Sequence, residues 1–144
     1  FREYYATHSR VKTSMYEGME QVMDALKEQN ISMAIVSNKA DDAVKDLAKY
    51  YFAKYIDVAI GEREGISRKP APDSVYEAMR LLGATKENTV YVGDSDVDRA
   101  TAKNAGIPCI SVTWGFRSEE FLVSLEPEYL IHKPEEILSV VTGK

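Results

Sequence analysis

Apolar residues recur at helical spacing in several stretches of the chain. Between positions 19 and 26, four of them stand at i, i+3, i+4 and i+7, which predicts an amphipathic helix over residues 17–29. Comparable patterns, ended by glycine or preceded by proline, predict further helices over residues 41–50, 75–82, 97–105 and 134–141.

Short apolar runs that do not alternate with polar residues stand between these helices. They predict strands over residues 32–36, 55–60, 89–92, 109–112 and 129–131. Runs of this kind are typical of strands that are buried on both faces of a sheet. Because strands and helices alternate along nearly the whole chain, we expect a three-layer, Rossmann-like α/β fold, with a parallel sheet covered by helices on both faces.

Composition and charge exclude several classes of function. The 144 residues favour a single domain, and 18 basic against 23 acidic residues give a net charge of −5. This charge argues against nucleic acid or an anionic membrane as a partner, and it requires any phosphate to be held by local groups. No apolar run approaches the roughly 18 residues of a membrane span, and no signal peptide is recognisable. The single cysteine, Cys109, excludes an internal disulfide, and we expect a cytoplasmic protein.

The residues that follow each predicted strand are the candidates for chemistry, because parallel α/β sheets bind ligands beyond the carboxyl ends of their strands. Ser37 and Asn38 follow the first strand, where a hydroxyl and the N–H groups of a helix could hold an anionic oxygen. Both are also common helix caps. Lys69, in the sequence Arg-Lys-Pro-Ala-Pro, could neutralise a phosphate, or it could be a solvated loop lysine.

Three carboxylates, Asp94, Asp96 and Asp98, fall within five residues after the third strand. Their mutual repulsion suggests a bound cation, and oxygen ligands without His or Cys favour Mg²⁺. A calcium loop of the EF-hand kind is excluded, since Arg99 and Ala105 stand where it needs glycine and glutamate. Asp96 alone is equally explained as a first-turn carboxylate that the helix dipole favours.

The order of these signals resembles the haloacid dehalogenase superfamily of Mg²⁺-dependent phosphatases. Ser37 resembles its second motif, Lys69 its third, and the run from Asp94 through Ser95 to Asp98 its fourth. Further likeness, in part to the phosphoglycolate phosphatase branch, lies in residues 16–19, 102–106 and 112–117.

The resemblance implies a phosphomonoester phosphatase that acts on a small phosphorylated metabolite, such as phosphoglycolate, through an aspartyl-phosphate. It implies that Ser37 and the backbone of Asn38 bind the transferring phosphoryl group and that Lys69 offsets its charge. Alternatives within the superfamily are a pyrophosphatase or a phosphosugar mutase. An alternative from a different functional class is a non-catalytic phosphate-binding domain. A receiver-like signalling domain is a further alternative, but it fits the order of the motifs less well.

The fourth motif is implied to bind the metal. Asp94 is expected to ligate Mg²⁺, with Ser95 as a weaker candidate. Asp98 is expected to support the metal site without ligating the ion, or to orient Lys69. Because the acidic loop needs a counter-ion, we expect the Lys69 ammonium to lie within salt-bridge distance of Asp94 or Asp98.

The superfamily's first motif, an Asp-x-Asp that supplies the nucleophile, is missing from this sequence. We expect residues 1–14 to be the tail of a helical cap and residues 15–144 to be the C-terminal portion of the core, inactive alone. The missing strand would lie between the strands that end at Val36 and Val92. Those two strands should therefore pair directly, or accept a strand from an N-terminal segment or a second chain.

Overall fold

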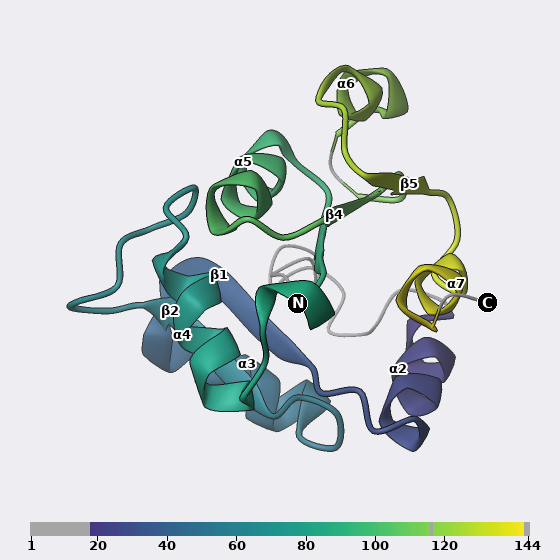
Figure 1. Ribbon diagram of the computed structural model, residues 1–144. Helices are drawn as coiled ribbons and strands as arrows, with labels where there is room; N and C mark the ends of the chain where they lie inside the picture. The colour runs from purple at the N-terminus through teal and green to yellow at the C-terminus, as the bar shows by residue number, and fades with distance from the viewer. Residues whose placement is uncertain (1–17, 116, 143–144) are drawn as a thin grey trace.

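Helices and strands alternate along the protein as the sequence predicts, in a computed structural model that describes residues 18–115 and 117–142 (Figure 1). The strands are β1 (Ala34–Ala40), β2 (Val58–Glu62), β3 (Tyr91–Gly93), β4 (Cys109–Val112) and β5 (Tyr129–Ile131). The helices are α2 (Met19–Glu28), α3 (Asp41–Phe52), α4 (Asp73–Leu82), α5 (Asp96–Ala105), α6 (Glu119–Ser124) and α7 (Glu136–Thr142), with a 3₁₀ turn at Lys86–Asn88. Within these ranges, no helix is long and apolar enough to cross a membrane.

The strands form two parallel sheets rather than one. In the first, β1 pairs with β2, with Ile35 opposite Ala59. In the second, β4 lies between β3 and β5, with Val92 opposite Ile110. The parallel α/β fold is therefore confirmed. Among the described residues β1 and β3 do not pair with each other, which excludes direct pairing, one of the alternatives that the sequence left open.

Each face of the strands packs against its own set of helices, which gives three layers. On one face, Ile35 of β1 and Val92 of β3 are buried in a cluster with α2, α3 and α7. On the other face, Val36 and Tyr91 are buried with α4 and α5. Adjacent strand residues point to opposite faces. The shared clusters thus place β1 and β3 in one layer although they do not pair.

Two of the helix ends follow directly from glycine. Gly83 and Gly106 end α4 and α5 in the left-handed conformation, with φ of 71° and 77°. This conformation costs glycine little because it has no Cβ. The short helix α6 was not predicted; its N-cap, Ser118, accepts a hydrogen bond from the Phe121 backbone.

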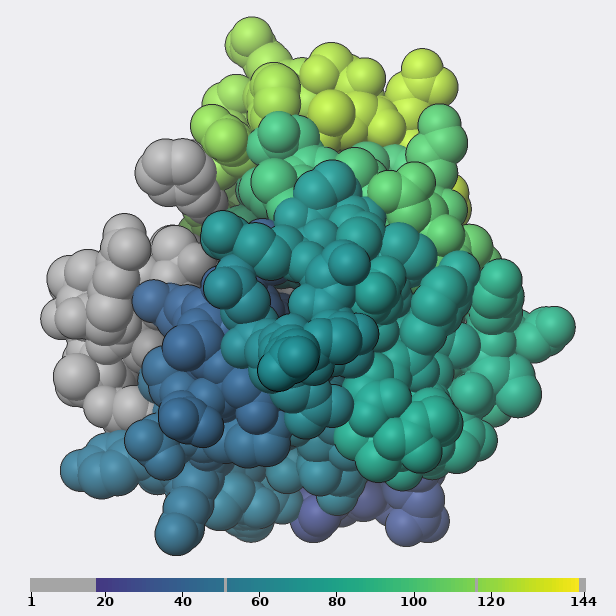
Figure 2. Space-filling view, turned by 90° about the vertical axis from the view of Figure 1, so that its left-hand side faces the viewer, coloured from purple at the N-terminus to yellow at the C-terminus, as the bar shows by residue number. Residues whose placement is uncertain are grey.

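The order of the chain can be followed on the molecular surface. In the face shown in Figure 2, blue residues lie at the lower left, dark teal residues in the centre, teal-green residues at the right and yellow-green residues at the top. Figure 1 places α2 and α7 side by side, in agreement with their contacts.

Candidate active site

The Asn38 side chain, near the carboxyl end of β1, binds the loop that follows β2. The Asn38 carboxamide donates to the Lys69 carbonyl at 3.2 Å and accepts from the Lys69 backbone N–H at 2.8 Å. This reciprocal pair docks the loop that carries Lys69 onto β1. The sequence offered no signal for it, because a side chain that binds backbone 31 residues away leaves no local pattern.

Ser37 is buried at the same edge, and its hydroxyl accepts a hydrogen bond from the Lys39 backbone at 3.1 Å. Helix α3 has Ala40 as its N-cap, so neither Ser37 nor Asn38 caps it. The alternative interpretation of these two residues as ordinary caps is therefore wrong.

Lys69 is buried and paired with Asp98. The distance from its Nζ to the Asp98 Oδ1 is 3.1 Å, and the two side chains are 0% and 1% exposed. The expected salt bridge is confirmed, and a solvated loop lysine is excluded. A buried ammonium requires a counter-charge and hydrogen-bond partners, which explains why both residues lie at this point.

Both oxygens of the Asp98 carboxylate accept hydrogen bonds from the protein. Its Oδ1 accepts from Lys69 and from the Tyr91 hydroxyl, the latter at 2.8 Å. Its Oδ2 accepts from the Asp94 backbone N–H and the Ser95 hydroxyl, both at 3.0 Å. Ser95 is also the N-cap of α5, where its hydroxyl accepts from the Asp98 backbone N–H at 3.3 Å. Asp98 is thus held in one orientation that faces Lys69.

The acidic cluster is divided among separate partners. Asp98 is neutralised by Lys69, whereas Asp96 is half-exposed and forms an ion pair with Arg117 at 3.3 Å. Asp94 is buried at the end of β3. Repulsion among the three carboxylates is therefore reduced by the cations that pair with Asp98 and Asp96.

Two glycines make room for the two buried carboxylates. A Cβ added at Gly93 would lie 2.2 Å from the Asp98 Cβ, and one added at Gly115 would lie 2.2 Å from the Asp94 Oδ2. The loop after β4 therefore passes directly against Asp94. The sequence marked Gly115 only as part of a likeness, because a close approach between two loops has no local signature.

The side chains at this edge offer oxygen donors, the kind of ligand that Mg²⁺ takes. Over residues 18–115 and 117–142, no group of three or more His, Cys, Asp or Glu side chains could hold a metal ion. Mg²⁺ does not need such a group, because it keeps several waters and takes one or two protein carboxylates. Asp98 has both oxygens bound by protein donors, so it is suited to support the site rather than to ligate a metal.

Cys109 has no role as a nucleophile in this arrangement. It is buried in β4, and burial raises the pKa of its thiol to about 12. A thiol with such a pKa is protonated at neutral pH and therefore unreactive.

Comparison with known proteins agrees with this geometry. The family model for haloacid dehalogenase-like hydrolases matches residues 1–112. Pyrophosphatase PpaX of Halalkalibacterium halodurans is 30% identical over 145 residues, which cover 100% of this chain and 67% of that protein. The phosphoglycolate phosphatase of Aquifex aeolicus is 28% identical over 142 residues, covering 98% of this chain and 65% of the relative.

A solved structure shows the same fold. A crystal structure from Lactobacillus delbrueckii subsp. bulgaricus, provisionally named a phosphoglycolate phosphatase, has a TM-score of 0.89 and 38% identity. The match covers 98% of this chain and 59% of that one, so the chain spans only part of its relatives. The residues that follow the strands, in the order in which they occur along the chain, agree with this family match. The chain belongs to the haloacid dehalogenase-like hydrolase family.

Proposed function

We propose that the protein is the core of a Mg²⁺-dependent phosphatase for a small phosphorylated metabolite. The observation that carries this proposal is the buried Lys69–Asp98 pair, which lies between Ser37 and Asn38 on one side and Asp94 on the other. A buried cation fixed at the carboxyl edge of a parallel sheet is suited to neutralise a phosphoryl group in a negatively charged protein.

In this proposal each side chain acts on the phosphoryl group by binding or charge. The Ser37 hydroxyl and the Asn38 backbone N–H donate to phosphoryl oxygens, and the Lys69 ammonium offsets negative charge on the group and on its nucleophile. Asp98 touches neither; it holds Lys69 in place. Phosphoryl transfer depends mainly on such positioning and charge neutralisation, so these roles account for most of what the chain contributes.

Asp94 would hold the metal ion. Bound Mg²⁺ would neutralise phosphoryl oxygens and hold them in a defined orientation. The chain's own contribution is a carboxylate that is buried, placed at a strand end and packed under the Gly115 backbone.

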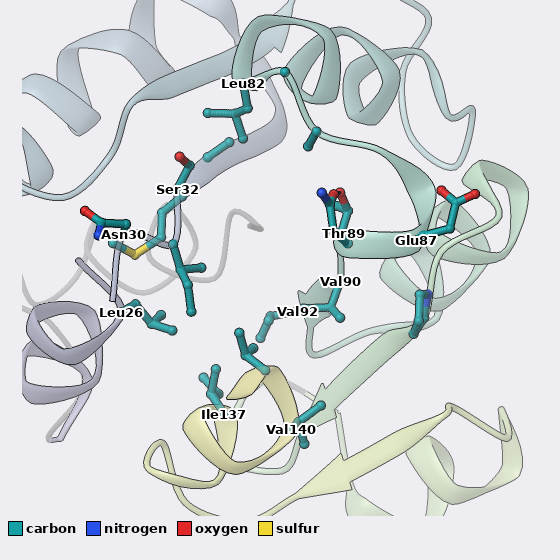
Figure 3. A pocket seen from close by; sticks show the side chains of 18 of the residues that line it. Leu26, Asn30, Ser32, Leu82, Glu87, Thr89, Val90, Val92, Ile137 and Val140 are labelled. Atoms are coloured by element: carbon teal, nitrogen blue, oxygen red, sulfur yellow. The ribbon is translucent and has the colours of Figure 1, made fainter. Parts of the chain in front are cut away.

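We further propose that the nucleophilic Asp comes from outside these 144 residues, on a strand that enters between β1 and β3. A cavity of about 700 Å³ lies between the two sheets (Figure 3). Its walls include Met33 and Ala34 at the start of β1, and Val90 and Val92 around β3. Side chains from α2, α7 and the loop before β3 complete the wall, among them Leu26, Glu87, Ile137 and Val140.

The two edge strands around this cavity have the same direction. The amino ends of β1 and β3 both border the cavity, while their carboxyl ends approach each other around Lys69. An apolar strand that runs parallel to both would fill the cavity, pair with the backbone on each side, and deliver its last residue beside Lys69. An Asp at that position would be the attacking group.

The names of the relatives, rather than a pocket of this chain, support three candidate substrates. A phosphoglycolate-like monoester is the first candidate, since it agrees with the Trp-Gly-Phe-Arg segment at residues 114–117 and with the named Aquifex relative. Pyrophosphate is the second candidate, because relatives at 30–31% identity carry the pyrophosphatase name. A phosphosugar is a third, because one solved structure with a TM-score of 0.75 carries a phosphoglucomutase name.

The test joins this chain to a segment with the Asp-x-Asp motif and a cap, and assays phosphoglycolate, pyrophosphate and a hexose phosphate. We expect hydrolysis that requires Mg²⁺ and falls sharply, to a measurable residual rate, in Lys69→Ala, whereas Lys27→Ala, on the exposed side of α2, retains it. Equal activity of the two lysine variants, or no release of phosphate from any substrate, would contradict the proposed function.

A further inference from the structure

We propose that Tyr91 is a positioning residue for Lys69, an inference that rests on the proposed function. The Tyr91 hydroxyl lies 3.1 Å from the Lys69 Nζ and 2.8 Å from the Asp98 Oδ1. Lysine, aspartate and tyrosine therefore form a closed ring of three contacts, and all three residues are buried.

The direction of each hydrogen bond in the ring follows from the donors available. An ammonium only donates and an ionised carboxylate only accepts. Lys69 therefore donates to both Tyr91 and Asp98, and the Tyr91 hydroxyl donates onward to Asp98. Two of the three N–H bonds of Lys69 are directed by these partners, which determines where the third points.

The position of Tyr91 on β3 explains why its hydroxyl reaches this point. Tyr91 and Gly93 lie on the same face of the strand, two residues apart. Because Gly93 has no Cβ, the Asp98 side chain packs against the strand there, within reach of the phenol. The Tyr91 ring itself belongs to the apolar cluster with α4 and α5. The change Tyr91→Phe would keep that packing and remove only the hydroxyl.

Loss of the hydroxyl should affect the position of the ammonium more than the stability of the fold. Misplacement of a catalytic group by about 1 Å can lower a rate about a hundredfold. In the joined protein of the preceding section, we expect Tyr91→Phe to lower kcat by about 10- to 100-fold, with a smaller change in KM. Tyr76→Phe is the matched control, since the Tyr76 hydroxyl donates to the Asn104 carbonyl at 3.3 Å, at an exposed position.

The first experiment needs no activity. The 144-residue chain, labelled with ¹⁵N-lysine, should show a slowly exchanging Lys69 ammonium signal, because that group is buried and hydrogen-bonded. We expect Tyr91→Phe to accelerate its exchange with water and to shift the signal, and Tyr76→Phe to leave it unchanged. Near-identical Lys69 spectra in all three proteins, with folding verified by circular dichroism, would overturn the proposal.

The second experiment asks whether Tyr91 acts through Lys69. In the joined protein, Tyr91→Phe, Lys69→Ala and the double variant form a cycle, with kcat as the readout. We expect Tyr91→Phe to change the rate less than about twofold once Lys69 is absent. Independent, multiplying losses would instead indicate a structural role and refute positioning. If the joined parent protein hydrolyses nothing, the proposed function fails, and the exchange experiment still decides whether Tyr91 holds Lys69.

Discussion

At the scale of single residues, the Asp94 carboxylate is the group whose charge should matter most for the metal. Asp94→Asn keeps the size of the side chain and removes its charge, so we expect weaker Mg²⁺ binding and a kcat lower by about a hundredfold or more in the joined protein. The measurement is turnover as a function of Mg²⁺ concentration. Asp96→Asn is the control, because Asp96 pairs with Arg117 at the surface, and a near-normal rate for Asp94→Asn would remove that residue from the mechanism.

Gly115 allows a second test of the same site without changing any ligand. In Gly115→Ala the new Cβ would lie 2.2 Å from the Asp94 Oδ2, so the carboxylate or the loop has to move. We expect Mg²⁺ affinity to fall about tenfold or more, measured by calorimetry on the joined protein, because support of a ligand affects affinity on this scale.

Gly65→Ala separates this effect from a general cost of replacing a loop glycine. Nothing lies within 4 Å of a Cβ at Gly65, although its φ of 87° makes alanine strained. That variant should lose some stability and keep its Mg²⁺ affinity. Unchanged affinity in Gly115→Ala would show that Asp94 is not held against this loop.

At the scale of elements, the Asn38 carboxamide links β1 to the loop that carries Lys69. Asn38→Ala removes two hydrogen bonds to the Lys69 backbone, and we expect a loss of about 1–3 kcal/mol in the free energy of unfolding. The measurement is denaturant unfolding of the 144-residue chain.

Asn104→Ala provides the comparison at the same loop. The Asn104 carboxamide donates one hydrogen bond to the Pro70 carbonyl at an exposed position, so its removal should cost clearly less. If the two variants are equally stable, the partly buried Asn38 carboxamide does not dock the loop more firmly than the exposed Asn104 carboxamide.

Elements and site residues differ in how far the sequence predicts them. The strands at residues 109–112 and 129–131 and the glycine ends of α4 and α5 agree with the structure, because they depend on local periodicity and on backbone conformation. The strand predicted from residue 55 begins at Val58 instead, since Tyr55 still bonds to the end of α3 and buries its ring.

In the candidate site, too, the sequence predicts what depends on local pattern and misses what depends on contacts between distant segments. Ser37, Lys69 and Asp98 could be identified because each lies in the segment that follows a predicted strand, and because their order along the chain resembles that of a known family. The contributions of Tyr91, Gly115 and the Asn38 side chain could not, since each arises from a contact between segments that are remote in the chain.

At the scale of the whole molecule, the separation of the two sheets should make activity depend on a second segment. We expect the 144-residue chain alone to show no hydrolysis of p-nitrophenyl phosphate in millimolar Mg²⁺, because it supplies no nucleophilic Asp at the site. Addition of the part of the Lactobacillus delbrueckii protein that lies outside the match should restore activity.

The control for this experiment is the same added segment with both motif aspartates changed to asparagine. It should bind the chain and raise its melting temperature without restoring hydrolysis. Robust Mg²⁺-dependent hydrolysis by the chain alone, with contaminating enzyme excluded, would show that another carboxylate attacks.

The two ends of Lys69 are attached to different sheets. Its backbone is bound by Asn38, at the end of β1, and its ammonium by Asp98 and Tyr91, beside β3. Lys69 therefore connects the two sheets mechanically, in addition to supplying a positive charge to the site. A force or fluctuation that separates the sheets has to break these bonds, so the site would lose its geometry at the first step of opening, before the rest of the fold yields.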